Sequence, residues 1–305
     1  MAKIAFLFPG QGAQAVGMGR QLYDELPAAR SLFDRANEVL GFDLKAICFE
    51  GPADALNATD VSQPALFVAS LAALEDLKVK HPAAFETCAG AAGLSLGEYT
   101  ALCFAGAFDF ETGLKLVRKR GEAMQAASLA TPSGMTSVLG LDGDKLDELV
   151  RQVAERGGRA WKANMLCPNN VAISGDAAAL EVIEPIATEL GAMKAVPLAV
   201  AGAFHTPLMK PADDELAQAL ASMEIRPTRI PVYSNVDTAP HPEDPNAIRR
   251  TLAMQVTQGV RWEESIRRML ADGFDTFYEI GPGRVLTGLL KRIDRKMACN
   301  HVAAR

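Results

Sequence analysis

The chain has 305 residues, of which 49% are hydrophobic, so it can bury the core of one large globular unit or of two closely joined ones. Its formal net charge of −6 argues against a nucleic-acid-binding protein. No apolar run is long enough to cross a membrane, and five scattered cysteines are typical of reduced thiols in a cytoplasmic protein. A strand is predicted from residue 3 onward, so we expect no signal peptide before the fold.

The first part of the chain predicts strands and helices in alternation. The elements expected are a strand over residues 3–8, a helix over 18–40 broken at Pro27, a helix over 65–78 opened by Ser62-Gln63-Pro64, a small apolar segment at 88–92, and helices over 98–105 and 111–127. The helix over residues 65–78 is apolar nearly all round and is therefore expected to be buried. The loop at residues 9–14 has two glycines but no Lys-Ser/Thr of a phosphate loop, so we expect it to bring backbone N–H groups and Gln11 to a site.

Gly93-Leu94-Ser95-Leu96-Gly97 has the Gly-x-Ser-x-Gly pattern of a nucleophile elbow. Such a turn holds the serine backbone in a strained conformation, and glycine fits where the flanking backbones come close. It also directs the N-terminus of the following helix toward any anion that forms at the serine. A Gly-Ser loop without chemistry is the alternative, and the motif alone leaves the two about equally supported.

Arg120 occupies an apolar position in the helix predicted over residues 111–127. Glu111, Lys115, Arg118 and Glu122 share one face, where their spacing favours ion pairs in solvent. Arg120 points instead toward the face that carries the apolar side chains, where an arginine is costly without an anionic partner. It therefore pairs either with an internal carboxylate or with an acidic ligand.

Residues 132–199 predict a separate small subdomain. The elements expected are strands over residues 135–141, 159–165, 170–174 and 193–200 and helices over 142–156 and 176–190. Their βαββαβ order is the ferredoxin-like pattern. We therefore predict that this subdomain is inserted into a large α/β domain made of residues 1–131 and 200–305.

The remaining elements carry the candidate base. They are a helix over residues 211–223, a strand over 230–235, helices over 247–258 and 264–270, a strand over 276–280, and a last helix that bears Lys291, Arg292, Arg295 and Lys296. Among the four histidines, only His205 follows a predicted strand in a Gly-Ala-Phe loop, which favours it as general base. No acidic residue is obvious as the third member of a triad with Ser95 and His205. Gln255 lies at an apolar helix position, as Arg120 does.

These residues predict acyl transfer. Ser95 would be the nucleophile and His205 the base, while the backbone N–H groups of Leu96 and Gln11 would form an oxyanion hole. The Arg120 fork would bind a carboxylate on the acyl group, which predicts an acidic acyl ester or thioester as substrate.

The chain resembles the malonyl-CoA:acyl carrier protein transacylases of type II fatty acid synthesis over its whole length. The resemblance depends on six segments in the family's order, namely residues 8–14, 93–99, 120–121, 202–205, Gln255 and residues 281–286. It implies a hydrolase-like parallel α/β core with a ferredoxin-like insertion. It also implies ping-pong transfer of malonyl from coenzyme A to the phosphopantetheine thiol of acyl carrier protein through a malonyl-serine ester. Both thioesters are substrates, so we expect no cofactor or metal, and we expect a monomer.

The resemblance also assigns further residues. It implies that the main-chain carbonyl of Gln255 orients His205 and that Phe204 crowds out a methyl branch, which selects malonyl. Asn164 matches an asparagine of the family, but its second asparagine is Leu166 here, and the histidine that usually precedes the nucleophile is Leu94. Both changes remove polarity near the acyl pocket and leave acyl selectivity open.

Three other functions compete with this prediction. They are malonyl loading of a polyketide carrier protein, hydrolysis by a serine thioesterase, and a non-catalytic subunit that docks carrier protein. Arg120 argues against simple hydrolysis, and intact Ser95 and His205 argue against a docking subunit. The acidic carrier protein would approach a basic surface, either the Lys115 surface (Lys115, Arg118 and Lys119) or the Arg284 surface (Arg284, Lys291 and Arg292). Ordinary solvated charge explains each set equally well.

Overall fold

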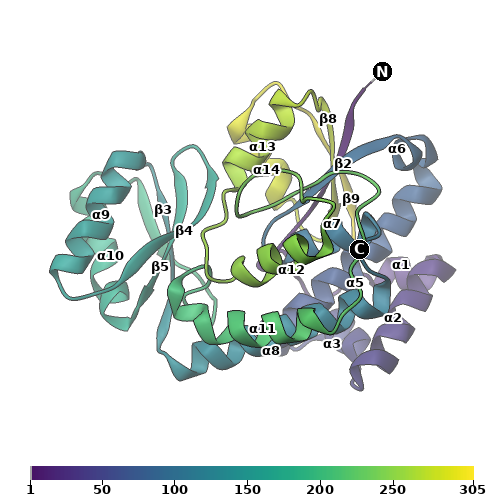
Figure 1. Ribbon diagram of the computed structural model, residues 1–305, viewed down its shortest axis with the longest axis horizontal. Coiled ribbons are helices and arrows are strands. Elements are labelled where there is room, and N and C mark those ends of the chain that lie inside the picture. Colours follow the sequence, from purple (N-terminus) through teal and green to yellow (C-terminus); the bar gives the residue numbers. More distant parts are fainter. Residues whose placement is uncertain (1) are drawn as a thin grey trace.

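The computed structural model describes residues 2–305, which form two sheets covered by helices (Figure 1). The larger sheet has five parallel strands in the order β7-β2-β1-β8-β9. Its strands are β1 (Ile4–Phe8), β2 (Cys88–Gly93), β7 (Val232–Tyr233), β8 (Thr276–Gly281) and β9 (Cys299–Ala303). Since all five run in one direction, the loops that follow them meet at one edge of the sheet. The predicted α/β class is confirmed.

Most of the helices pack on the two faces of this sheet. In chain order they are α1 (Arg20–Glu25), α2 (Pro27–Leu40), α3 (Leu44–Glu50), α4 (Ala53–Asn57), α5 (Thr59–Lys80), α6 (Pro82–Glu86), α7 (Leu96–Phe104), α8 (Phe110–Ala130), α9 (Gly143–Glu155), α10 (Ala177–Glu189), α11 (Lys210–Ala221), α12 (Pro245–Met254), α13 (Trp262–Ala271) and α14 (Val285–Ile293). None of the helices within residues 2–305 is both long enough and apolar enough to cross a membrane.

Strand β1 separates the two halves of the main core, because successive side chains of a strand point to opposite faces. Phe6 and Phe8 join the apolar cluster formed with α2, α5, α7 and α8. Ala5 and Leu7 join the cluster formed with α13 and α14. All five residues of β1 are buried, as the continuous apolar run predicts for a strand covered on both faces.

Helix α5 is buried nearly all round, as predicted, but it begins at Thr59, earlier than expected. Pro64 therefore lies inside the helix, where it cannot donate to the carbonyl four residues before it. That carbonyl belongs to Asp60, and it accepts a hydrogen bond from Nη1 of Arg118 at 2.9 Å. The side chain from α8 thus replaces the missing backbone donor, which local sequence could not reveal.

The smaller sheet is antiparallel, with the order β4-β5-β3-β6. Its strands are β3 (Ser133–Leu139), β4 (Ala160–Cys167), β5 (Asn170–Asp176) and β6 (Lys194–Pro197). Helices α9 and α10 pack against it with an apolar core of their own (Figure 1). The elements follow the predicted order, and the Asp142 side chain caps α9 by accepting from the Lys145 backbone N–H.

Several predicted boundaries are wrong. β7 has two residues rather than six, and Pro231 before it has no N–H for a strand ladder. α12 ends at Met254, so Gln255 caps the helix instead of lying within it. α14 ends at Ile293, before Arg295 and Lys296. Strand β9 was missed because the sequence Cys-Asn-His-Val-Ala carries no clear apolar period, and its pairing with β8 is a long-range effect.

Candidate active site

Ser95 lies in a sharp turn between β2 and α7, with φ 50° and ψ −103°. A residue with a side chain adopts such a conformation at a cost. A Cβ on Gly93 would lie 1.9 Å from the carbonyl carbon of Gly97, and a Cβ on Gly97 would lie 2.0 Å from the carbonyl oxygen of Phe8. Backbone contact therefore requires both glycines, and the predicted turn geometry is confirmed.

Asn235 braces this turn. Its Oδ1 accepts a hydrogen bond from the Ser95 backbone N–H at 2.6 Å, and its Nδ2 donates to the Gly93 carbonyl at 2.8 Å. The side chain is fully buried and follows β7, the neighbour of β2 in the sheet. The amide thus continues the pairing between the strands across the turn. The sequence analysis missed Asn235, because an asparagine after a strand is typical of an ordinary loop.

His205 lies beside Ser95. Its Nε2 is 2.8 Å from Ser95 Oγ, and its Nδ1 is 2.8 Å from the Gln255 carbonyl oxygen. A carbonyl only accepts, so Nδ1 carries the proton and the lone pair of Nε2 faces the serine hydroxyl. Burial, with a contribution from the Arg120 charge, lowers the pKa of His205 to about 4. The imidazole is therefore neutral at physiological pH and can accept a proton.

Arg120 reaches the same hydroxyl from α8. The side chain is 1% exposed; its Nη1 donates to Gln63 Oε1 at 2.7 Å, and its Nη2 donates to Ser95 Oγ and Gln255 Oε1, each at 3.0 Å. Within residues 2–305 it forms no ion pair with a carboxylate. The internal-carboxylate explanation for its burial is therefore wrong. Nε is also buried and finds no hydrogen-bond partner in the described part of the chain, so the cation is under-satisfied.

Gln63 is a second residue that the sequence analysis missed as part of this site. It is fully buried on α5, where its Nε2 also donates to Sδ of Met124 at 3.4 Å. The available signal was a long amide side chain on a helix whose other buried polar residues, Thr59, Ser62 and Ser70, are small. Gln63 and Gln255 hold the guanidinium through neutral amides, so they fix its position without neutralising its charge.

Of the two predicted oxyanion donors, Leu96 lies at the turn and Gln11 lies in the loop that packs against it. Leu96 is the first residue of α7, so its N–H has no partner within the helix. The loop that carries Gln11 packs against the turn, because a Cβ on Gly10 would lie 2.3 Å from the Leu94 carbonyl oxygen. The Gln11 side chain donates to Thr59 Oγ1 at 3.4 Å. The arrangement leaves the backbone of residues 10–11 beside the turn.

Among residues 2–305, the side chains of Phe204 and Asn164 form no hydrogen bond with Ser95, His205 or Arg120. Phe204 is buried in the main core, and its carbonyl accepts from Ser174 Oγ of β5 at 2.8 Å. Asn164 lies on β4, and its buried Oδ1 has no hydrogen-bond partner within the residues that the structure describes. Leu94 is buried in one apolar cluster, and Leu166 packs against the same cluster. Apolar contact thus links the turn to β4 at this point.

A family profile described as "Acyl transferase domain" matches residues 5–302. The malonyl CoA-acyl carrier protein transacylase of Bacillus subtilis is 44% identical over 297 residues, which are 97% of this chain and 92% of that protein. The chain belongs to the malonyl-CoA–acyl carrier protein transacylases of the acyl transferase family. The human mitochondrial malonyl-CoA-acyl carrier protein transacylase is 42% identical to this acyltransferase, over 93% of this chain and 75% of that one.

Solved structures share the fold of the acyltransferase. An acyl-carrier-protein-S-malonyltransferase from Bartonella henselae has a TM-score of 0.93 at 40% identity and covers 98% of this chain and 95% of its own. A malonyl-transacylase solved in complex with its type II PKS acyl-carrier protein has a TM-score of 0.92 at 38% identity, with coverage of 99% and 95%. The acyltransferase therefore combines this shared fold with a serine hydroxyl that contacts both an imidazole and a guanidinium.

Proposed function

We propose that the chain transfers the malonyl group of malonyl-CoA to the phosphopantetheine thiol of acyl carrier protein and so supplies fatty acid elongation. The observation that carries the proposal is the buried Arg120 cation, which donates to Ser95 Oγ at 3.0 Å while only neutral groups hold it. A planar cation beside a nucleophilic hydroxyl fits an acyl group that ends in a carboxylate. Simple ester hydrolysis needs no such group.

In the first half-reaction, Ser95 Oγ attacks the thioester carbonyl of malonyl-CoA while Nε2 of His205 accepts its proton. The carbonyl oxygen becomes an oxyanion that accepts from the N–H groups of Leu96 and Gln11. The adduct then collapses, the C–S bond breaks, and His205 returns the proton to the coenzyme A sulfur. Malonyl remains on Ser95 as an ester.

In the second half-reaction, the phosphopantetheine thiol of acyl carrier protein attacks the malonyl-serine carbonyl. His205 takes the thiol proton and later returns it to Ser95 Oγ as the ester C–O bond breaks. Arg120 holds the malonyl carboxylate in both halves. The Gln255 carbonyl orients His205 in place of the acidic third member of a triad, and a neutral imidazole suits both proton transfers.

We assign Phe204 and Asn164 to the acyl pocket, where Phe204 limits branching and Asn164 contributes an unpartnered amide oxygen. Residues 132–199 act as a ferredoxin-like subdomain, supported by the β4-β5-β3-β6 strand order. Residues 1–131 and 200–305 act as a hydrolase-like catalytic domain. The chain works as a cytoplasmic monomer and without a cofactor.

The Arg284 surface is the docking site that we favour for acyl carrier protein. Two members of the Lys115 surface, Arg118 and Lys119, are paired with carboxylates. Lys291 and Arg292 line a hollow with Pro168 and Arg295 and form no ion pair among residues 2–305. Free cations attract an acidic partner more strongly than neutralised ones.

Intact-mass spectrometry tests the reaction. The protein mixed with malonyl-CoA should gain one malonyl group, and Ser95→Ala should gain none. Adding acyl carrier protein should move the group to the carrier faster than free malonate appears. Faster release of malonate would favour a hydrolase, and carrier binding without an acyl-enzyme would favour a docking subunit. Comparing fatty acid and polyketide carrier proteins separates the two pathways.

A further inference from the structure

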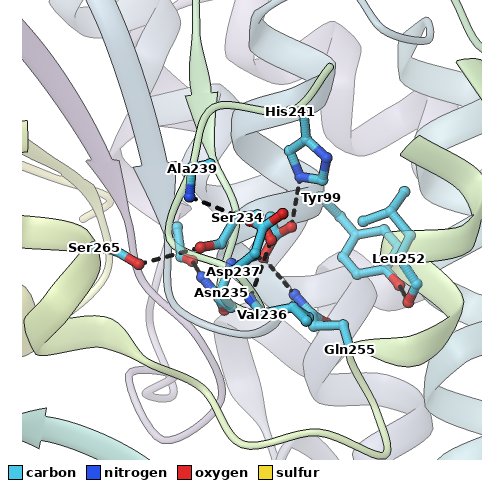
Figure 2. A network of polar contacts seen from close by, with 12 residues as sticks. Tyr99, Ser234, Asn235, Val236, Asp237, Ala239, His241, Leu252, Gln255 and Ser265 are labelled. Atoms are coloured by element: carbon cyan, nitrogen blue, oxygen red, sulfur yellow. Dashed lines mark hydrogen bonds and ion pairs between the residues drawn. The ribbon is translucent and has the colours of Figure 1, made fainter. Parts of the chain in front are cut away.

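Glu98 is a fully buried carboxylate that the reaction described above does not use. It lies in the first turn of α7, three residues after Ser95, and its side chain is 0% exposed. Its Oε1 accepts from Nε2 of His241 at 2.7 Å, and its Oε2 accepts from the Asn235 backbone N–H at 2.9 Å and from Nε2 of Gln255 at 2.8 Å. Figure 2 shows His241, Asn235 and Gln255 converging in this network.

The local sequence suggests a different use for Glu98. Ser95-Leu96-Gly97-Glu98 matches the capping box, in which the glutamate bonds back to the backbone N–H of the first residue. In the structure Asn235 takes that N–H, and the Ser95 hydroxyl faces His205 and Arg120. Neither member of the motif caps the helix, so both side chains are available to the site.

Glu98 fixes which way the Gln255 amide points. Nε2 of Gln255 donates to the Ser95 carbonyl at 3.0 Å and to Glu98 at 2.8 Å, and both of these oxygens can only accept. Oε1 of Gln255 must therefore face Arg120, whose Nη2 can only donate. A reversed amide would place N–H groups against the guanidinium, so this orientation keeps Arg120 beside Ser95.

Glu98 also supports the brace behind the nucleophile. The Asn235 backbone donates to Glu98, and the Asn235 side chain holds the backbone on either side of the turn. One carboxylate thus connects to Ser95 through two routes, Asn235 and Gln255. Its third partner is His241, whose side chain is 0% exposed and whose Nδ1 has no hydrogen-bond partner among residues 2–305.

We propose that Glu98, held by His241, is a positioning residue that keeps Gln255 and Arg120 in the arrangement that selects a malonyl group. The inference rests on the proposed roles of Ser95 and Arg120. Loss of the Glu98 carboxylate would let the Gln255 amide reverse or shift. Arg120 would then lose a fixed acceptor, and the advantage of an acyl group with a carboxylate would fall.

The test compares acylation rates with malonyl-CoA and with acetyl-CoA, which lacks the carboxylate, for three variants. Glu98→Gln removes the charge at constant shape, His241→Phe removes only the donor to Glu98, and His241→Gln offers an amide donor in its place. Glu279→Gln is the matched control. Glu279 is also fully buried and accepts from the N–H groups of Leu286 and Thr287, away from the site.

We expect the malonyl-to-acetyl rate ratio to fall about tenfold in Glu98→Gln and His241→Phe, the effect of one weakened charge-assisted contact. His241→Gln should restore part of the ratio. Glu279→Gln should lower the melting temperature but leave the malonyl-to-acetyl rate ratio unchanged. If Glu98 were merely structural, its loss would lower the acylation rates with malonyl-CoA and acetyl-CoA by the same factor, because less of the protein would be folded.

An unchanged ratio in folded Glu98→Gln and His241→Phe would overturn the inference. If Glu98→Gln does not fold, the two His241 variants decide, since they keep the carboxylate. Failure of the proposed function looks different: the wild type gains no malonyl group, or Ser95→Ala still gains one. A wild type labelled at Ser95 together with an unchanged ratio contradicts the positioning role alone.

Discussion

Replacing Gln63 with glutamate tests whether the Arg120 charge must remain free for the substrate. The change keeps the shape of the side chain and places a carboxylate where Oε1 now accepts from Nη1 of Arg120 at 2.7 Å. The new charge would neutralise the guanidinium from inside the protein. A malonyl carboxylate on the remaining nitrogens would then meet a like charge about 6 Å away, which costs about 3 kcal/mol at an effective dielectric constant of about 20.

That cost predicts a loss of roughly 100-fold in kcat/KM for malonyl-CoA. Acetyl-CoA carries no second carboxylate, so its acylation rate should change far less. Gln63→Met is the matched control, because it removes the hydrogen bond but adds no charge. Arg120→Ala sets the lower limit of kcat/KM for malonyl-CoA, since losing the whole cation should cost on the order of 2–4 kcal/mol of transition-state binding for malonyl.

All three variants are assayed by the initial rate of acyl-enzyme formation, with thermal melting to correct for the folded fraction. The Gln63→Glu side chain also faces the Met124 sulfur, which now accepts from Nε2, so some loss of stability is expected. The reasoning is refuted if folded Gln63→Glu accepts malonyl as fast as Gln63→Met does.

Three further predictions follow from the geometry. Asn235→Ala should lower stability by about 1–3 kcal/mol and slow acylation with both acyl-CoAs, as measured by melting and by burst kinetics; unchanged kinetics would show that the brace is dispensable. His205 takes up a proton only near pH 4 in the folded protein but near pH 6.5 when unfolded. Its contribution to stability is therefore present above about pH 6.5 and is lost as the pH falls toward 4. The kcat/KM for acylation should stay level down to about pH 5 and fall with a midpoint near the His205 pKa, and a midpoint near 6.5 in the pH profile contradicts this account. Gly97→Ala should prevent folding or cost several kcal/mol, because its Cβ would lie 2.0 Å from the Phe8 carbonyl. Gly143→Ala, whose Cβ meets nothing within 4 Å, should be tolerated in the same denaturant titration.

The fold could be predicted in outline because its signals are local. The apolar run of β1, the all-round apolar surface of α5 and the glycines at the turn each follow from side chains close together in the sequence. Boundaries failed where distant groups decide them. Arg118 from α8 compensates for Pro64 inside α5, and β9 pairs with β8 although its own pattern is weak.

The site was predictable where chemistry restricts the residue type. Ser95, His205 and Arg120 stood out because a serine in a Gly-x-Ser-x-Gly turn, a histidine after a predicted strand and an arginine at an apolar helix position are uncommon. The structure places Nε2 of His205 and Nη2 of Arg120 within 3.0 Å of Ser95 Oγ. The sequence analysis missed Gln63, Asn235 and the Glu98 network. Their roles depend on contacts more than 50 residues apart in sequence, and their residue types suit ordinary caps and loops.

The most direct test is to locate the acyl group after a brief exposure to malonyl-CoA. Peptide mass spectrometry of the quenched protein should find one malonyl group on Ser95, and it should disappear when acyl carrier protein is added, as malonyl-carrier protein forms. A malonyl group on another residue, or malonyl-carrier protein formed by Ser95→Ala at the wild-type rate, would contradict the account.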